Sequence, residues 1–519
     1  MGDKESGRDN GEILPIRIAA TDIGSNALRF LAVEFVAESN IRMLDQLRVP
    51  VRLGHDVFLT GRLTDDAIEA AVAALATFSR RAHELDVTLH RSVATSAVRE
   101  SRNGNVLVER ARSEADMIVE PITGAEEARL VHLAVAHRVK LGKQKWLVAD
   151  LGGGSVEVSI VDEKGIYRTE SHEMGSVRLL EELAVAGEEP GHFRRRLEEY
   201  TATLRESRIM HGKVAGFIAT GGNIESIAKL ANAETDGAGV SVLSVRDLRG
   251  ITERLARLPY KERVTQLGLR EDRADVILPA ATVYERLAVL AGVDTIIVPN
   301  VGVKDGVVLD LFEQYAWGGR RRSTQERAVI ASALALGRRL HFDETHARHV
   351  AKLAGTLFDQ LEAVHGLNSE DRKLLIAAAL LHDIGLFIAP KRHHKHSLYI
   401  ISQSELAGLT QNEIDMVANT ARYHRKTPPA SHHEPFMKLS DRDRDRVVRL
   451  SAILRLADSL DREHLQRVDS VSAHVEDGAL ELTITGRGDL LLERWALQRK
   501  AQLFEKVYDL SVTLTNASE

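Results

Sequence analysis

Two stretches of sequence decide the fold of this chain: ATDIGSNALRFLAVE at residues 20–34 and VADLGGGSVEVSIVD at residues 148–162. In each, an apolar run ends at an aspartate, a turn containing glycine follows, and a second apolar run begins at once. That order predicts two β-hairpins, with Asp22 and Asp150 at the ends of their first strands. The two aspartates lie 128 residues apart.

A second motif recurs at nearly the same offset. The strand predicted over Leu89–Ala94 ends at Thr95, and the strand predicted over residues 217–219 ends at Thr220, 125 residues further on. Two unlike motifs that repeat in the same order indicate duplicated α/β halves with a cleft between them. Helices are expected at about 64–85, 103–114, from about Ile224, 275–290 and near 307–316, and a strand at Thr295–Val298.

The remaining sequence divides into further segments. We predict a polar tail at 1–15, a first half made of 16–124 plus about 302–316, a second half at 125–301, and a linker at 317–326. Residues 327–467 have helical periodicity, with apolar stripes at 329–340, 346–364, 371–381 and 446–460, and predict an all-α domain. From 468 to 519 a hairpin, a helix near 491–506 and a last strand at Leu510–Leu514 predict a small α+β domain. The alternating run Asp441–Arg446 is interpreted as a solvated helix face.

Composition excludes several classes of function. The 519 residues are 44% hydrophobic and 28% charged, with a net charge of −6, so the chain is neither disordered nor strongly basic, and we expect no nucleic-acid partner. No cysteine is present, which excludes disulfides, thiolate catalysis and Cys-ligated metal. The apolar runs are too short to span a bilayer and the N-terminus has no apolar leader, so we expect a cytoplasmic protein without a membrane partner.

The two aspartate–glycine turns indicate phosphate chemistry. Glycine turns after strands aim consecutive N–H groups at one point, as phosphate oxygens require. An aspartate there would repel phosphate unless it held Mg²⁺, and this reasoning makes Asp22 and Asp150 candidate magnesium ligands. Thr220-Gly221-Gly222, before a helix, is a candidate anion site. The other candidate phosphate donors are Ser25, Asn26, Arg29, Gly152, Gly153, Gly154 and Ser155.

The residues alone leave other interpretations open. The two aspartate turns could be plain hairpins, and Thr220-Gly221-Gly222 could be only a tight turn. A Walker P-loop is excluded because no G-x-x-x-x-G-K-[ST] occurs, and a Rossmann fingerprint is excluded because a strand follows the Gly152 turn. Glu157, on the second strand of its hairpin, could face the same cleft as Asp150.

At these residues the sequence resembles the exopolyphosphatase/guanosine pentaphosphate phosphohydrolase (Ppx/GppA) family, a branch of the actin-like (RNase H-like, ASKHA) fold. The similar segments run in the family's order over about 16–312 and include, besides the two hairpins, ATSAVRES at 94–101, ITGAEEARL at 122–130, MGSVRL at 174–179, ATGGNIESIA at 219–228, LPAATVYERL at 278–287 and VPNVGVKDGVVLDL at 298–311.

The resemblance implies Mg²⁺-dependent hydrolysis of a terminal phosphate by in-line attack of water, and a homodimer. It places the catalytic base on Glu127, with Glu126 as the alternative, because two adjacent glutamates on a helix point about 100° apart. It puts metal-linked carboxylates at Asp150 and Glu157. Its phosphate-binding positions fall on Asn26, Arg99, Gly152–Ser155, Gly221 and Gly222.

Three functions follow for the core. The first is an exopolyphosphatase that releases orthophosphate from inorganic polyphosphate. The second is hydrolysis of the 5′-phosphate of guanosine pentaphosphate. The third, from another class, is a regulator that binds polyphosphate or nucleotide with an idle catalytic core.

Histidines gather in the predicted helical domain: eleven of the 21 fall between His341 and His433. The order His346, His382-Asp383, Asp458 resembles the HD phosphohydrolase superfamily, where such groups bind divalent metal, and His396 and His424 could extend the set to a second ion. Longer Ppx/GppA members carry a similar domain that commonly holds polyphosphate without metal. Four interpretations of this histidine-rich domain therefore stay open. It could hold a divalent metal, form a basic path for polyphosphate, act as an independent phosphohydrolase, or have no role. The path would use Lys391, Arg392, His396, His424, Arg425 and Lys426.

Overall fold

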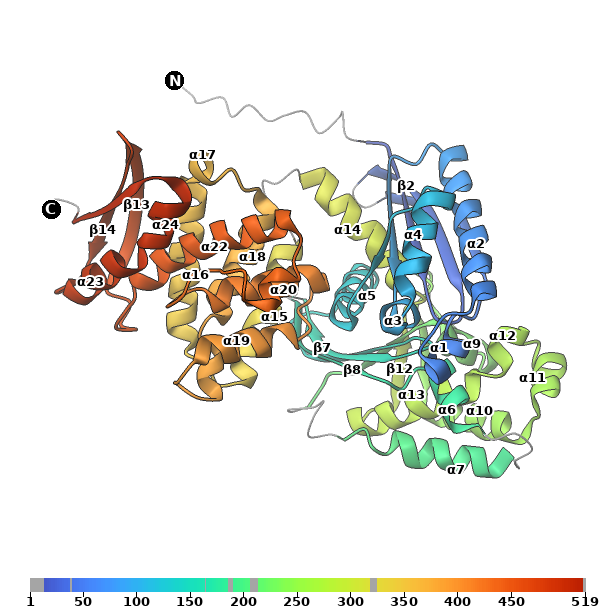
Figure 1. Cartoon of the computed structure of the whole chain (residues 1–519). Coiled ribbons are helices and arrows are strands. Elements are labelled where there is room, and N and C mark those ends of the chain that lie inside the picture. Colours follow the sequence, from blue (N-terminus) through green and yellow to red (C-terminus); the bar gives the residue numbers. More distant parts are fainter. Residues whose placement is uncertain are drawn as a thin grey trace, which may run out of the picture. The chain divides into compact units, whose positions relative to one another are not determined.

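The computed structural model describes residues 14–37, 40–163, 165–184, 190–205, 213–317 and 324–516 (Figure 1). The chain divides into two compact units, unit 1 at Met1–Thr324 and unit 2 at Gln325–Glu519. Most of the predicted polar tail and linker lies outside the described residues. Among the described helices, none is both long enough and apolar enough to cross a membrane.

Unit 1 contains two mixed sheets. The first has the strand order β3-β2-β1-β4-β5, and the second has the order β10-β11-β12-β9-β6-β7-β8. The strands of the first sheet are β1 (Ile16–Ile23), β2 (Leu28–Ala37), β3 (Asn40–Val49), β4 (Leu89–Ala94) and β5 (Val119–Pro121). Those of the second are β6 (Trp146–Leu151), β7 (Val156–Asp162), β8 (Gly165–His172), β9 (Phe217–Thr220), β10 (Glu234–Thr235), β11 (Ser241–Ser244) and β12 (Thr295–Val298).

The two sheets repeat one topology. In the first, β1 pairs antiparallel with β2, which pairs antiparallel with β3, while β4 and β5 add parallel strands on the other side. In the second, β6, β7 and β8 form the same antiparallel ribbon, and β9 and β12 add the same parallel strands. This repetition confirms the predicted duplicated actin-like halves. Asp22 and Asp150 occupy equivalent positions in the repeat, each next to last in its strand. Thr95 and Thr220 do not, because Thr220 pairs with Asp150 whereas Val93 pairs with Asp22.

Helices cover the sheets on the faces where the strands are apolar. They are α1 (Gly54–Thr60), α2 (Asp65–Glu84), α3 (Ser96–Glu100), α4 (Gly104–Ala115), α5 (Gly124–Arg138), α6 (Ser176–Leu183), α7 (Pro190–Thr201), α9 (Gly222–Leu230), α10 (Val245–Arg257), α11 (Tyr260–Leu267), α12 (Glu271–Ala274), α13 (Ile277–Ala291) and α14 (Val303–Trp317). Side chains of α2 and α4 pack on one face of the first sheet, and Figure 1 shows these two helices beside its strands.

Two helices, α5 and α14, form a core that both sheets share. Val131 and Val135 of α5 and Val307 of α14 are buried together with Ile18 of β1 and Ile218 of β9. Because apolar side chains of both halves are removed from water in one cluster, this core fixes the two sheets relative to each other. It also holds the first turn of α5, which carries Glu126 and Glu127, against the sheet ends.

Unit 2 is a set of helices followed by a small sheet (Figure 1). The helices are α15 (Thr324–Arg339), α16 (Glu344–Gln360), α17 (Glu362–His365), α18 (Ser369–Leu381), the 3₁₀ turn η2 (Ile384–Phe387), α19 (His393–Ser402), α20 (Gln411–Arg422), α21 (Glu434–Met437) and α22 (Asp441–Ser459). The sheet orders β13 (Val468–Glu476), β14 (Ala479–Gly486) and β15 (Ser511–Asn516), with α23 (Leu491–Lys500) and α24 (Gln502–Tyr508) between the last two strands. One hydrophobic core joins the helices and the sheet, since Val468, Leu480 and Phe504 cluster with Leu375 and Leu454.

Several predicted elements need correction. The helix expected near 307–316 begins at Val303, because the Asp305 carboxylate accepts a hydrogen bond from the Gly302 N–H at 2.8 Å and caps the first turn. The helix expected near 491–506 is two helices that meet at Ala501. The Asp441–Arg446 face is not simply solvated, because Arg446 donates to Asp371 of α18 at 2.6 Å.

Candidate functional site

The two aspartate turns meet at one cleft in unit 1, with a volume of about 230 Å³. Asp22 and Asp150 both line it, although they belong to different halves. The turn residues predicted to bind phosphate that also line it are Ser25, Asn26, Arg29, Gly152, Gly153, Gly221 and Gly222. Gly221 has φ +104°, a conformation that side-chain-bearing residues rarely adopt, so glycine is required where β9 turns into α9.

The duplicated hairpins carry opposite charges at one equivalent position. Arg29 stands across the strand pair from Asp22, and Glu157 stands across from Asp150. Arg29 Nη1 donates to Asp22 Oδ2 at 2.8 Å, so the first hairpin neutralises its own aspartate. The second hairpin instead places two carboxylates side by side.

The carboxylates of the second hairpin are buried and oriented by hydroxyl groups. Thr220 donates to Asp150 Oδ1 at 2.6 Å, and Ser155 and Ser171 donate to Glu157 Oε1 at 2.6 and 2.9 Å. Glu157 Oε2 is buried and has no hydrogen-bond partner. Burial, and then the charge of Asp150, raise the pKa of Glu157 to about 7. The pKa of Asp150 is also raised, mainly by burial. A divalent cation would relieve this unfavourable accumulation of negative charge.

Glu127 points into the cleft from the first turn of α5, a helix whose N-cap Thr123 accepts from the Glu126 N–H. Arg99 Nη1 donates to Glu127 Oε1 at 2.6 Å and to the Ile122 carbonyl at 2.7 Å. Burial, and then the nearby Glu157, raise the pKa of Glu127 well above its ordinary value. A buried carboxylate held by a single arginine beside a phosphate-sized cavity is suited to accept a proton from water.

Glu126, the alternative base, is turned away from the cleft. Arg129 Nε donates to its Oε2 at 2.7 Å and Arg129 Nη2 to its Oε1 at 2.9 Å, and Arg91 lies 3.4 Å from Oε1. Glu126 is not among the residues that line the cleft. It belongs instead to a buried ion network that also contains Asp310 of α14.

Five further predicted residues do not line the cleft. Glu157, which was expected to face it beside Asp150, is buried and is not among the lining residues. Thr220 and Ser155 hold the carboxylates of Asp150 and Glu157, and Arg99 holds Glu127. Gly154 packs against Ser96 and Phe58, so its glycine leaves room for these side chains rather than for a ligand.

Four cations that were not among the predicted site residues complete the cleft: Arg48, Arg270, Arg273 and Lys304 line it together with Arg29. Burial, followed by the like charges of Arg29, Arg48 and Arg270, lowers the pKa of Arg273 to about 10. The Nε atoms of Arg48 and Arg273 are buried without a hydrogen-bond partner. The protein itself supplies too few hydrogen-bond acceptors and negative charges for arginines gathered in this way, so the cleft favours an anionic ligand.

Comparisons with known proteins agree with this geometry. The sequence pattern of the Ppx/GppA phosphatase family matches residues 32–315, more than half of the chain. The chain belongs to the Ppx/GppA phosphatase family. It is therefore a phosphatase-family hydrolase, and the pattern of Ppx/GppA phosphatase domain III matches residues 329–502.

Individual relatives differ in their described activity. A guanosine-5′-triphosphate,3′-diphosphate pyrophosphatase from Pseudoalteromonas atlantica is 26% identical over 421 residues, 79% of each chain. The crystal structure of an exopolyphosphatase from Cytophaga hutchinsonii is 27% identical, with a TM-score of 0.54 over 57% of this chain and 97% of that one. The Ppx/GppA family member of Aquifex aeolicus is 26% identical, with a TM-score of 0.50 over 57% of this chain and 97% of that one.

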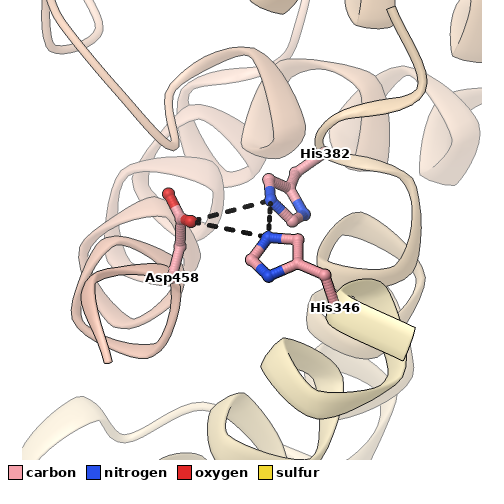
Figure 2. Close-up of side chains that lie close together, drawn as sticks. All are labelled: His346, His382 and Asp458. Atoms are coloured by element: carbon pink, nitrogen blue, oxygen red, sulfur yellow. Dashed lines mark hydrogen bonds and ion pairs between the residues drawn. The ribbon is translucent and has the colours of Figure 1, made fainter. Parts of the chain in front are cut away.

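The Ppx/GppA domain III of this chain contains a buried histidine–aspartate cluster. His346 of α16, His382 at the end of α18 and Asp458 of α22 point toward one another, as Figure 2 shows. His346 Nε2 lies 3.3 Å from His382 Nε2, and Asp458 Oδ1 lies 4.0 and 3.7 Å from these two nitrogens. The structure thus brings together the predicted residues His346, His382 and Asp458, with Asp383 beside them.

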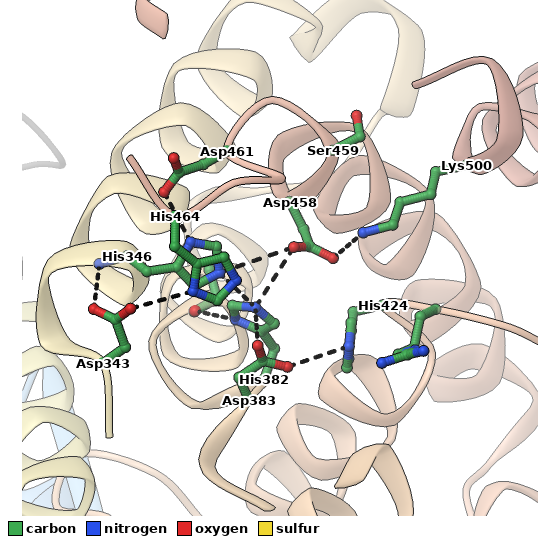
Figure 3. Close-up of polar contacts among 12 residues, drawn as sticks. Asp343, His346, His382, Asp383, His424, Asp458, Ser459, Asp461, His464 and Lys500 are labelled. Atoms are coloured by element: carbon green, nitrogen blue, oxygen red, sulfur yellow. Dashed lines mark hydrogen bonds and ion pairs between the residues drawn. The ribbon is translucent and has the colours of Figure 1, made fainter. Parts of the chain in front are cut away.

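A second cluster adjoins the first through Asp383 (Figure 3). Asp383 Oδ1 lies 3.1 Å from His393 Nε2 and 3.4 Å from His424 Nε2. The prediction that His396 would join His424 is wrong: His393 occupies that place, because His393, Ser397 and Ile401 form the buried face of α19. Burial lowers the pKa of His424 to about 3, so its ring is neutral at pH 7.

The predicted polyphosphate path is only partly gathered in space. His424, Arg425 and Lys426 line a cavity of about 620 Å³ in unit 2, whereas Lys391, Arg392 and His396 do not. The remaining cations of that cavity are residues that sequence reasoning missed: Arg455, Arg462, Arg499 and Lys500.

Among the described residues, the His, Asp and Glu clusters with ligand atoms within 4.8 Å of one another all lie in unit 2. The predicted magnesium ligands Asp22, Asp150 and Glu157 do not form one. Each of the three accepts hydrogen bonds from its own neighbours, and Asp22 is already paired with Arg29. Mg²⁺ is commonly held through one or two carboxylates and several waters, so Asp150 and Glu157 suffice chemically.

Proposed function

We propose that this chain is an exopolyphosphatase that releases terminal orthophosphate from inorganic polyphosphate by in-line attack of water. The observation that supports this most directly is the composition of the unit 1 cleft, where converging glycine turns, five cations and a buried glutamate line one small cavity. Such a cavity suits a terminal phosphoryl group, whose transfer depends on positioning and on charge stabilisation.

In this proposal Glu127 is the general base. Its carboxylate orients the attacking water and accepts its proton, while Arg99 keeps the side chain in place. The N–H groups of Gly153 and Gly222 and the side chains of Arg29 and Arg273 bind the phosphate oxygens. The Gly152 N–H, predicted to take part, donates instead to the Ser155 carbonyl at 3.0 Å and closes the turn.

Mg²⁺ is the proposed cofactor, held mainly by Asp150 and Glu157. The unpartnered Glu157 Oε2 and the raised pKa values of both carboxylates fit a divalent cation. When bound, the ion neutralises charge on the phosphate. Asp22, predicted as a third ligand, is assigned the additional task of orienting Arg29 through their ion pair.

Hydrolysis of guanosine pentaphosphate is the second candidate. It is favoured by the similarity to the guanosine-5′-triphosphate,3′-diphosphate pyrophosphatase of Pseudoalteromonas atlantica over 79% of the chain. A polyphosphate- or nucleotide-binding regulator with an idle core is the third.

One experiment distinguishes the three. Orthophosphate release is measured from long-chain polyphosphate and from guanosine pentaphosphate at equal terminal-phosphate concentration, with and without Mg²⁺, with the Glu127→Gln chain as the blank. Faster Mg²⁺-dependent release from polyphosphate is expected. Faster release from guanosine pentaphosphate would select the second candidate, and binding without release would select the third.

For unit 2 we propose that His346, His382, Asp383 and Asp458 bind a divalent transition metal, since imidazole and carboxylate suit Mn²⁺, Fe²⁺ or Zn²⁺. Metal analysis of the purified chain tests this, and loss of the metal in His382→Ala is expected.

We also propose that Arg425 and Lys426 hold polyphosphate. We further propose that the protein is cytoplasmic and a homodimer. Sedimentation of the full chain tests the homodimer.

A further inference from the structure

Two arginines of the unit 1 cleft have no part in binding the terminal phosphoryl group, which is assigned to Arg29, Arg273 and the glycine turns. They are Arg48 and Arg270, and both line the cleft. We propose that these two arginines form a second phosphate subsite for the phosphates behind the terminal one, and that Asp272 competes with the substrate for this subsite. The inference rests on the proposed function and deepens it, because the second subsite binds a phosphate chain more tightly than the orthophosphate that is released.

Arg48 comes to the cleft from β3, the edge strand of the first sheet. The Cα register pairs Asp22 with Arg29 and Arg29 with Arg48, so these three residues form one row across β1, β2 and β3. Directly opposite residues on neighbouring strands present their side chains on the same face, and such strands lie about 4.8 Å apart. Arg48 therefore lies one strand beyond Arg29, within reach of a phosphate chain whose end is held at Arg29.

The residues of β3 alternate between the cleft and the core. Gln46 and Arg48 line the cleft, whereas Leu47 and Val49 pack against the hydrophobic core of the first half. Successive side chains of a strand point to opposite faces, so this alternation directs Arg48 toward the cleft. Its Nε atom is buried without a hydrogen-bond partner. A buried donor that lacks an acceptor is unfavourable and gains from an anionic ligand.

Asp272 of α12, in the second half, is the carboxylate that the two arginines share. Arg48 Nη2 donates to its Oδ2, and Arg270 Nε lies 3.6 Å from its Oδ1. The Asn26 amide donates to the Asp272 carbonyl at 2.8 Å and so ties α12 to the first aspartate turn. The Asp272 side chain is 12% exposed and is not among the residues that line the cleft. One carboxylate thus contacts both arginines from outside the surface that a ligand touches.

The charges of the cleft favour an anion. Among the described residues, the ion pairs of the cleft arginines involve two carboxylates, Asp22 and Asp272. Burial lowers the pKa of Arg48, and the like charges of Arg270 and Arg29 lower it further, while the charge of Asp272 acts against this. Two carboxylates serve four cleft arginines, which are Arg29, Arg48, Arg270 and Arg273.

Asp272 and a phosphate oxygen compete for the same donors. Both are anions that accept charge-assisted hydrogen bonds from a guanidinium group. Orthophosphate held at Arg29 does not extend to Arg48, so Asp272 keeps its partner. A longer chain brings further negative charges to Arg48 and Arg270 and displaces Asp272 from them. The subsite therefore strengthens the binding of a chain, and Asp272 limits that gain.

Ligand affinity is the first test, measured on the full chain with the Glu127→Gln substitution so that turnover does not disturb binding. The probes are orthophosphate, pyrophosphate and tripolyphosphate, titrated calorimetrically at one fixed concentration of Mg²⁺. We expect the affinity to rise along this series. Adding Arg48→Gln removes a hydrogen bond to a charged group and should lower the affinity for tripolyphosphate about 10–100-fold, with that for orthophosphate changed only a few-fold.

Arg52→Gln is the matched control. Arg52 makes the same kind of bridge between the two halves, with Nη2 2.6 Å from Asp275 Oδ2, but it does not line the cleft. The three affinities should therefore stay within a few-fold in this variant. Thermal unfolding of each variant separates loss of the fold from loss of the subsite.

Asp272→Asn tests the competition. Asparagine keeps an oxygen that accepts from Arg48 but removes the negative charge. The affinity for tripolyphosphate should rise several-fold, and that for orthophosphate should change less. A lower affinity for tripolyphosphate would show that Asp272 only holds Arg48 in place, and would overturn the competition.

Turnover with Glu127 intact gives a second readout. Arg48→Gln should raise the KM for tripolyphosphate about 10-fold or more and leave kcat within a few-fold, because Arg48 binds phosphates other than the reacting one. An equal loss of kcat would place Arg48 at the reacting phosphate and overturn its assignment to a second subsite.

The outcomes separate the subsite from the proposed function. Equal affinities for orthophosphate and tripolyphosphate, or an Arg48→Gln variant that keeps the full difference, overturn the subsite but not hydrolysis in the cleft. Turnover that persists in Glu127→Gln contradicts the proposed base, and the KM comparison then still decides on the subsite. Binding of none of the three phosphates overturns both proposals.

Discussion

Replacement of Glu127 by glutamine is the sharpest test of the proposed chemistry in unit 1. Glutamine keeps an oxygen that accepts the 2.6 Å hydrogen bond from Arg99, and Arg99 keeps its bond to the Ile122 carbonyl. The variant therefore loses the basic carboxylate and little else. A general base contributes about 10²–10⁴ in rate, or roughly 2.7–5.4 kcal/mol of transition-state free energy.

Stability should not fall in Glu127→Gln. Burial and the neighbouring Glu157 disfavour the charge of Glu127, since both raise its pKa. A neutral amide removes this unfavourable charge, so we expect the melting temperature to stay or to rise. Turnover is measured as orthophosphate release with saturating substrate, and binding as the KM or as direct polyphosphate affinity. Turnover should fall by the stated factor, with binding changed only a few-fold.

Glu126→Gln is the matched control, with the same chemical change one residue away. Glu126 is tied to Arg129 by two hydrogen bonds inside a buried network, so its loss should destabilise the fold by up to about 3–5 kcal/mol. Turnover per folded molecule should stay within a few-fold. Near-normal turnover in Glu127→Gln would show that Glu127 is not the general base. Loss of turnover in a folded Glu126→Gln variant would show that Glu126 is the general base instead.

Three further outcomes follow from the cleft. The pKa of Glu157 is about 7, against an ordinary 4.5, so the fold favours the protonated form of this side chain. In the metal-free protein, the protonated carboxyl therefore stabilises the fold below about pH 4.5. This stabilisation is lost as the pH rises through 7. The rise in melting temperature on adding Mg²⁺ should therefore be larger at about pH 8 than at about pH 6, and a gain independent of pH would contradict the site. Thr220→Val removes the hydroxyl that donates to Asp150 and should weaken Mg²⁺ binding about 10–100-fold in a titration; unchanged affinity would remove Asp150 from the metal site. Arg273→Gln should raise the KM for polyphosphate about 10-fold or more without lowering the melting temperature, because its own charge is disfavoured in the fold; an unchanged KM would show that Arg273 does not bind substrate.

Much of the fold could be predicted because the strands of unit 1 are short apolar runs with clear ends. The bounds of β4 and β12 are those expected from sequence. The sequence motifs that recur at offsets of 128 and 125 residues lie in two sheets that share one topology. The edge strands β3 and β8 were missed, since each has one face toward water and little apolar pattern to mark it.

The site was predictable only where a motif carries it. Asp22 and Asp150 could be brought together from topology alone, because equivalent strands of two facing halves end at the same cleft. Arg48 and Arg273 could not, since each is a single charged residue in an element without a motif, and only the tertiary fold turns them inward. His393 could have been found: Ser397 and Ile401 follow it at helical spacing and place it on the buried face of α19.

The duplication also explains why the proposed magnesium belongs to one half. Both hairpins place a residue across from their aspartate, seven positions on, but one residue is Arg29 and the other is Glu157. The first hairpin has its counter-charge within the protein and so offers a fixed cation to an anionic substrate. The second has two buried carboxylates and no such partner at that position, so it gains most from a divalent ion. In the proposed function, a single exchange of charge between the repeats thus assigns phosphate binding to one hairpin and metal binding to the other.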